Sequence, residues 1–199
     1  NAGVGMGSGI MIDGKLFRGS HGYASEVGHM IMNPQGELCG CGRRGCWETQ
    51  VGPRAVIRRF RETLRKGVPS TVLHAADNDL GNITFETVAN AALQGDAAAL
   101  EAMHEVGENL GFGIANLVNI FNPQMVVLGG ELNYANKILL PVVEQVIAGN
   151  AMKLESQDLK VVASAHGRDA CVMGAAALVL DDILHEPGFT NTSKGDYDV

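Results

Sequence analysis

The sequence predicts an α/β domain. Near its start, two short apolar runs flank a two-residue turn, which is typical of a β-hairpin. The second half alternates between short apolar strands and segments with apolar residues at helical spacing. The 199 residues are 46% hydrophobic and 19% charged, so the chain has ample apolar side chains for a core and is not disordered as a whole.

The hairpin is expected within residues 4–19. The runs 10–12 and 15–17 flank Asp13-Gly14, a strong two-residue turn signal. Residues 20–52 are irregular and rich in glycine. A loop of this length is uncommon in a compact domain unless it is functional or stapled, and a bound metal would supply the staple.

Five helices and two strands are expected after this loop. The helices are expected at residues 53–66, 84–94, 96–121, 136–148 and 170–184, and the strands at 125–128 and 159–163. Pro53 suits the first turn of its helix, and Asp96 suits the N-cap of the longest one. The polar tail 188–199 is expected to be frayed.

Three glycines interrupt the helix expected at 96–121, at Gly107, Gly111 and Gly113. Glycine costs about 1 kcal/mol relative to alanine inside a helix, so we expect these positions to pack closely against another element. The partner is either a neighbouring subunit or the core of the same chain, and the sequence leaves both open.

The net charge of −7 argues against a stand-alone nucleic-acid-binding protein, because affinity for phosphate backbones comes largely from lysine and arginine. Residues 43–66 are nevertheless basic, with eight cations against Glu48 and Glu62. A solvated helix face would explain them, and so would contact with an acidic partner or a neighbouring subunit. The longest apolar run, Cys171–Leu180, is far short of the ~18 residues of a membrane span, and no secretory signal opens the sequence.

The chain begins at Asn1 and runs directly into Gly3-Val4-Gly5. A domain seldom begins inside a glycine-punctuated strand, so we expect this chain to be the C-terminal part of a longer protein. A processed N-terminus is the alternative.

Three of the four cysteines, Cys39, Cys41 and Cys46, lie within eight residues. Disulfide scaffolds are usually small, secreted and rich in cysteine, so this cluster instead predicts a metal site in a cytoplasmic protein. With His29 the cluster forms a Cys3His set, the closed four-ligand inventory of structural zinc sites. A reduced cysteine cluster or a disulfide is the alternative. Cys171 lies in an apolar run and is expected to be a buried small hydrophobe.

Two carboxylates bracket this set, Glu26 three residues before His29 and Glu48 two residues after Cys46. Carboxylates and an imidazole N–H pair well with hydroxyl groups, and a site built on such pairs discriminates strongly between ligands. Glu26, His29 and Glu48 are therefore candidates for a site that binds a polyhydroxylated ligand. Surface charges beside a structural metal are the alternative.

Two motifs in this region, E-x-G-H and C-x-C-G-x-x-G-C-x-E, occur here as Glu26-Val27-Gly28-His29 and as Cys39 through Glu48. In these motifs the sequence resembles the ROK family (repressors, open reading frames and sugar kinases). Residues 7–19, 122–130 and 174–176 also resemble the family. The resemblance extends from residue 3 to about residue 187.

The resemblance implies that residues 1–187 form the C-terminal, sugar-binding lobe of an actin-like, ribonuclease-H-like ATPase fold, with 20–52 as a zinc-stapled loop. The residues implied to hold the structural zinc are His29, Cys39, Cys41 and Cys46. Those implied to contact sugar hydroxyls are Glu26, His29 and Glu48. The family's first lobe, with the catalytic aspartate and first phosphate loop of the kinases, is absent from this chain, so the chain alone is not expected to be an active enzyme. Family members are commonly homodimers or homotetramers.

The family contains both kinases and transcriptional regulators. Kinases carry a second phosphate loop resembling G-T-G-x-G-x-G, whereas here Val4 stands in place of the threonine and cannot donate a hydrogen bond to an ATP phosphate. If the protein were a kinase, the residues implied to bind the nucleotide are Gly5, Gly7, Gly129 and Gly130. The last two could equally form a simple strand-to-helix turn.

Two further features resemble the regulators. Trp47 stands where many kinases would carry leucine, and residues 177–187 resemble the end of a regulator. We therefore favour the sugar-sensing effector domain of a bacterial ROK-type transcriptional regulator, in which a helix-turn-helix domain upstream would contact DNA. The alternative is the C-terminal lobe of a glucokinase-like sugar kinase that uses ATP.

Overall fold

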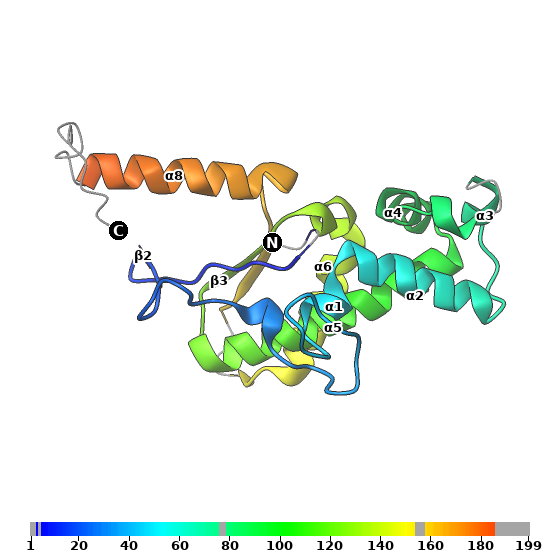
Figure 1. Ribbon diagram of the computed structural model, residues 1–199, viewed down its shortest axis with the longest axis horizontal. Helices are drawn as coiled ribbons and strands as arrows, with labels where there is room; N and C mark the ends of the chain where they lie inside the picture. Colours follow the sequence, from blue (N-terminus) through cyan, green and yellow to red (C-terminus); the bar gives the residue numbers. More distant parts are fainter. Residues whose placement is uncertain (1–2, 4, 76–78, 154–157, 186–199) are drawn as a thin grey trace.

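The computed structural model in Figure 1 describes residues 3, 5–75, 79–153 and 158–185. It has a mixed α/β fold, as predicted, and Val4 and the tail 188–199 lie outside the described residues. In chain order, with η for a short 3-10 helix, the elements are β1 (Met11–Ile12), β2 (Lys15–Leu16), η1 (Val27–His29), α1 (Glu48–Val51), α2 (Pro53–Arg65), α3 (Val72–Ala75), η2 (Leu80–Asn82), α4 (Phe85–Leu93), α5 (Ala97–Phe121), β3 (Met125–Leu128), η3 (Glu131–Ala135), α6 (Asn136–Asn150), β4 (Lys160–Ala163), η4 (Gly167–Asp169) and α8 (Ala170–His185).

The predicted hairpin is confirmed. Strands β1 and β2 pair antiparallel, with Met11 opposite Leu16. The turn residues Asp13 and Gly14 have φ of +51° and +75°. Two successive positive φ angles define the turn type that matches the twist of a hairpin, and Asp-Gly is among the pairs that adopt it most readily.

Helix α5 is the centre of the core. It packs against α1, α2, α4 and α6, and in Figure 1 it runs in green beneath α2. Its buried large side chains are Met103, Val106, Leu110, Ile114 and Val118. This repeat at helical spacing is the pattern that predicted the helix, and it now accounts for which face is covered.

The glycines of α5 lie inside the chain. A Cβ on Gly107 would come within 3.0 Å of the Val142 side chain, and one on Gly111 within 2.6 Å of that of Val146, both on α6. A Cβ on Gly113 would come within 2.0 Å of the Trp47 ring. The expected close packing is therefore confirmed, and its partners are side chains of the same chain. A role of this helix in a subunit interface stays a prediction.

Strands β3 and β4 form a parallel pair, with Val126 opposite Val161. Helix α6 connects them, as a parallel pair requires a crossover. Helix α5 ends at Asn122, whose φ of +43° stops the helix three residues before β3 begins.

Helix α8 lies where the sequence predicts a helix, but it is not buried. Figure 1 shows it, in orange, extending away from the other elements. Val172 is 70% exposed and Leu184 is 76% exposed. Cys171 is also exposed, so the prediction that it is buried is wrong. Apolar composition specifies the helix, but burial also needs a neighbour, and among the described elements α8 packs mainly on η4.

Three of the eight cations of the basic stretch, Arg58, Arg59 and Lys66, form ion pairs with glutamates of the described residues. Arg58 pairs with Glu62 at 3.8 Å, Arg59 pairs with Glu62 and Glu105, and a further pair joins the end of α2 to α5. These pairs support the interpretation of α2 as a solvated, charged helix face. Within the described ranges, no helix has both the length and the hydropathy that crossing a membrane requires.

Candidate metal centre

The loop between η1 and α1 folds back on itself and brings its cysteines together. Isolated antiparallel bridges join Ile31 to Cys46 and Leu38 to Arg44. The close approach of the two sides of the loop depends on glycine at position 45, between these two bridges. Gly45 has φ of +73°, and a Cβ there would lie 1.5 Å from the carbonyl oxygen of Asn33. No other residue fits this position without moving the backbone.

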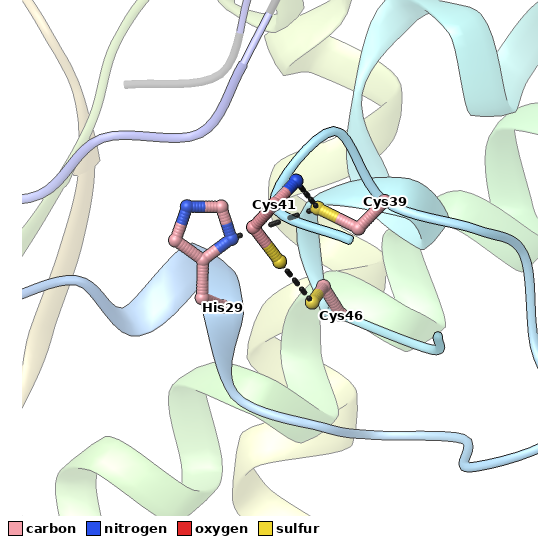
Figure 2. Close-up of side chains that lie close together, drawn as sticks. All are labelled: His29, Cys39, Cys41 and Cys46. Carbon is pink, nitrogen blue, oxygen red and sulfur yellow. Dashed lines mark hydrogen bonds between the residues drawn. The ribbon is translucent and has the colours of Figure 1, made fainter. Parts of the chain in front are cut away.

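Figure 2 shows that the side chains of His29, Cys39, Cys41 and Cys46 converge. Their ligand atoms all lie within 4.8 Å of one another. The Cys41 and Cys46 sulfurs are 3.5 Å apart, and the Cys39 sulfur is 3.6 Å from His29 Nδ1. Tetrahedral zinc with ordinary bond lengths places its ligand atoms about 3.3–3.8 Å apart. The four side chains therefore fit the metal that the sequence predicts for them.

The disulfide alternative does not fit. No disulfide joins Cys39, Cys41 and Cys46, and the 3.5 Å between the Cys41 and Cys46 sulfurs greatly exceeds a disulfide bond of about 2.05 Å.

The three thiols have unequal acidities. Burial raises the pKa of Cys39 to about 12 and also raises the pKa of Cys46. Hydrogen bonds from the backbone and side chain of Arg43 lower the pKa of Cys41 to about 6. Three thiolates at this spacing need compensating positive charge, which a divalent cation would supply.

The two predicted carboxylates lie on either side of the His29 ring. Glu26 Oε2 is 3.8 Å from His29 Nε2, and Glu48 Oε1 is 3.8 Å from His29 Nδ1. The Glu26 side chain is 67% exposed, whereas that of Glu48 is 20% exposed. The structure thus brings Glu26, His29 and Glu48 together, with Nδ1 toward the cysteines and Nε2 toward the open side. One ring nitrogen can serve a metal while the other serves a ligand, as the sequence analysis anticipates.

Two contacts that the local sequence pattern does not predict join this site to the glycine-rich segment 5–9. Met6 N–H donates to Glu48 Oε2 over 3.2 Å, and the Ser8 hydroxyl donates to the Ser25 carbonyl. The signal in the sequence that could have indicated these contacts is the glycine run that begins at Gly3, because repeated glycines often mark close approach of another backbone segment or a ligand.

The four predicted nucleotide-binding glycines do not share a single cavity among the described residues. Gly5 lies beside Glu48, and Gly7 lines an apolar groove of about 330 Å³ along β3. Gly129 lines a small cavity of about 40 Å³. Gly130, with φ of +89°, lines a separate polar hollow of about 530 Å³. A role of these glycines in binding a nucleotide therefore stays a prediction.

The sequence model of the ROK family matches residues 1–182. The chain belongs to the ROK family. The expectation drawn from the motifs at residues 26–29 and 39–48 is therefore confirmed.

ROK relatives of this chain include both regulators and kinases. The chain is 36% identical over 189 residues to a xylose repressor of Caldicellulosiruptor bescii, covering 95% of this chain and 47% of the repressor. It is 39% identical over 181 residues to the DNA-binding transcriptional dual regulator NagC of Escherichia coli, covering 91% of this chain and 43% of the regulator. The chain thus spans about half the length of the curated relatives it matches.

A solved ROK structure shares the fold. The glucokinase of Streptomyces griseus, in complex with glucose and AMPPNP, superimposes with a TM-score of 0.78 at 31% identity. The match covers 89% of this chain and 58% of the kinase.

Proposed function

We propose that this chain is the sugar-sensing effector domain of a ROK transcriptional regulator, with a sugar bound beside a structural zinc. The observation that carries the proposal is the placement of Glu26 and Glu48 within 3.8 Å of the two nitrogens of His29, at the edge of the His/Cys3 cluster. Carboxylates accept hydrogen bonds from sugar hydroxyls. A site whose polar groups are held in place discriminates between sugars by which hydroxyls can pair with it.

Zinc in this site would be a scaffold. His29 and three cysteines fill the four positions of a tetrahedral ion, so the metal would hold the loop and leave no position free for a substrate. The loop in turn would hold Glu26 and Glu48 at the sugar. Sugar binding would favour whichever conformation of the regulator binds it more tightly, and that difference in affinity would be the signal passed to DNA.

Two features of the chain support a regulator. Both relatives cited above with repressor or regulator names match at 36–39% identity. The net charge of −7 suits a domain that leaves DNA contact to a helix-turn-helix elsewhere in the protein. Assembly as a homodimer or homotetramer belongs to the same proposal, since paired DNA-binding domains need paired subunits.

Calorimetric titration of the zinc-loaded protein tests the sugar site. The panel is D-glucose, D-xylose, N-acetyl-D-glucosamine and the 6-phosphates of the two hexoses. We expect one of them to bind, and Glu26→Gln and Glu48→Gln each to weaken that binding about tenfold, because each loses a charged acceptor.

Glu37→Gln is the matched control, since Glu37 is an exposed glutamate of the same loop that lies outside the trio. Binding of the preferred sugar with unchanged affinity by both Glu26→Gln and Glu48→Gln would show that the two carboxylates are surface charges beside a metal.

A glucokinase-like kinase is the second candidate. The polar hollow at Gly130 and the likeness to a kinase bound to glucose and AMPPNP favour it. The hollow is also lined by Glu86, Asn90 and Arg168. Sugar-dependent ATP turnover by the whole protein would establish the kinase, whereas sugar-dependent release from DNA without ATP turnover would establish the regulator.

A further inference from the structure

The glycine-rich segment 5–9, which precedes the hairpin, is held against the candidate sugar site at Met6. Met6 N–H donates to Glu48 Oε2 over 3.2 Å. On the other side, Gly28 lies so close that a Cβ there would come within 2.5 Å of the Met6 carbonyl oxygen. The segment 5–9 is thus in contact with both parts of the chain that carry the acidic side chains of the site.

A second contact lies two residues farther along this segment. The Ser8 hydroxyl donates to the Ser25 carbonyl, and Ser25 is the residue immediately before Glu26. The hydrogen bond therefore fixes the peptide unit from which Glu26 projects.

Ser25 has an unusual backbone. Its φ of +73° lies in the left-handed region, which residues with a Cβ seldom adopt. Its own hydroxyl is buried and has no hydrogen-bond partner in the part of the chain that the structure describes. The side chain of Ser25 therefore does not account for the conformation, whereas the Ser25 carbonyl is held by the hydrogen bond that it accepts from Ser8. Backbone strain of this kind persists where the surroundings enforce it, often next to functional groups.

We propose that Ser8 and Ser25 are positioning residues of the sugar site. The Ser8 hydroxyl holds Ser25 in its left-handed conformation, and this conformation directs the Glu26 carboxylate to the His29 side where the sugar would lie. Since Glu26 is 67% exposed and has its one described ion pair with His29, the backbone conformation beside it is what limits where the carboxylate can reach. This inference rests on the proposed sugar-binding function and adds Ser8 and Ser25 to Glu26, His29 and Glu48 of that site.

Sugar binding and the ordering of residues 5–9 are thermodynamically linked. If the ordered segment favours sugar binding, a bound sugar must favour the ordered segment by the same factor. Amide exchange in residues 5–9 should therefore slow when the sugar binds.

Calorimetry on zinc-loaded variants tests the proposal with the panel of sugars named above. Ser8→Ala should weaken sugar binding about fivefold, the value of one net hydrogen bond. Ser25→Val should weaken it more, because a β-branched residue resists positive φ. Ser25→Gly should restore near-normal affinity, because glycine adopts positive φ freely. Ser20→Ala is the matched control, since Ser20 is an exposed serine of the same loop with no hydrogen bond to described residues.

The readouts separate positioning from a purely structural role. Zinc content should be unchanged in every variant, and the slowing of exchange at residues 5–9 by sugar should be lost in Ser8→Ala. A Ser8→Ala protein that melts at a lower temperature but binds sugar with normal affinity would overturn the proposal and leave the sugar site intact. A wild-type protein that binds no sugar of the panel would instead overturn the proposed function, and this inference with it. Should Ser25→Val fail to fold, Ser8→Ala and Ser25→Gly still decide the matter.

Discussion

Single residues decide how several elements begin, and Asp96 is the clearest case. Its carboxylate accepts hydrogen bonds from Ala99 N–H at the start of α5, from Thr71 N–H, and from the hydroxyls of Ser70 and Thr71. The residue therefore caps α5 and ties the segment before α3 to it. The sequence indicated the cap, but the two partners 25 and 26 residues away required the tertiary structure.

Asp96→Ala should lower the free energy of unfolding by about 2 kcal/mol, because it removes an N-cap and the acceptor of three further hydrogen bonds. Urea denaturation measures the change. Asp158→Ala, at an exposed aspartate outside this network, should change stability by less than about 0.5 kcal/mol. Equal effects of the two substitutions would contradict the assignment.

The same residue predicts a pH dependence. Burial alone would raise the pKa of Asp96, but the hydrogen bonds from Ala99, Thr71 and Ser70 outweigh it and lower the pKa. A lowered pKa in the folded state stabilises the protein above the unfolded value of about 3.9, and this stabilisation is lost as the pH falls through the folded pKa. The stability difference between wild type and Asp96→Asn should therefore shrink as the pH is lowered from 6 to 3 in urea titrations. A constant difference would show that the charge of Asp96 does not contribute.

At the scale of elements, the packing of α5 against α6 depends on small residues. Gly111 allows Val146 to approach the α5 backbone, where a Cβ would lie 2.6 Å from the valine. The opposite case is Gly149 of α6, where a Cβ would meet no atom of the described residues within 4 Å beyond its own turn of the helix. The two glycines thus occupy helices under different constraints.

Gly111→Ala should destabilise the protein by about 1–3 kcal/mol, because overpacking outweighs the better helix propensity of alanine. Gly149→Ala should stabilise it by up to about 1 kcal/mol, because only the propensity changes. Thermal and urea unfolding of both variants provide the measurement. A Gly111→Ala protein as stable as Gly149→Ala would refute the close approach of the two helices.

At the scale of the whole molecule, the loop between η1 and α1 has little regular structure and yet adjoins the core. Cys46 and Trp47 are fully buried beside α5, and Trp47 Nε1–H donates to the Asn109 carbonyl at 2.8 Å. If zinc holds this loop, metal binding contributes to the stability of the whole domain.

Chelation of zinc should lower the melting temperature, and metal analysis should find about one zinc per chain. Cys46→Ser should reduce both the zinc content and the melting temperature. Cys171→Ser, at an exposed cysteine outside the cluster, should change neither. A metal-free protein with an unchanged melting temperature would exclude a structural zinc.

The sequence by itself determined the local features of this protein. The Asp-Gly turn, the cap at Asp96, the helical repeat of α5 and the Cys3His inventory all follow from residues close together in the chain, because turns, caps and spacing are short-range properties. The tertiary structure decided the rest. It placed Glu26 and Glu48 on two sides of His29, Gly113 against Trp47, and Met6 on Glu48 across 42 residues. It also left Cys171 exposed on an apolar helix. The burial of a side chain and the meeting of distant residues depend on which segments pack together. The local sequence of one segment does not specify which other segment will pack against it.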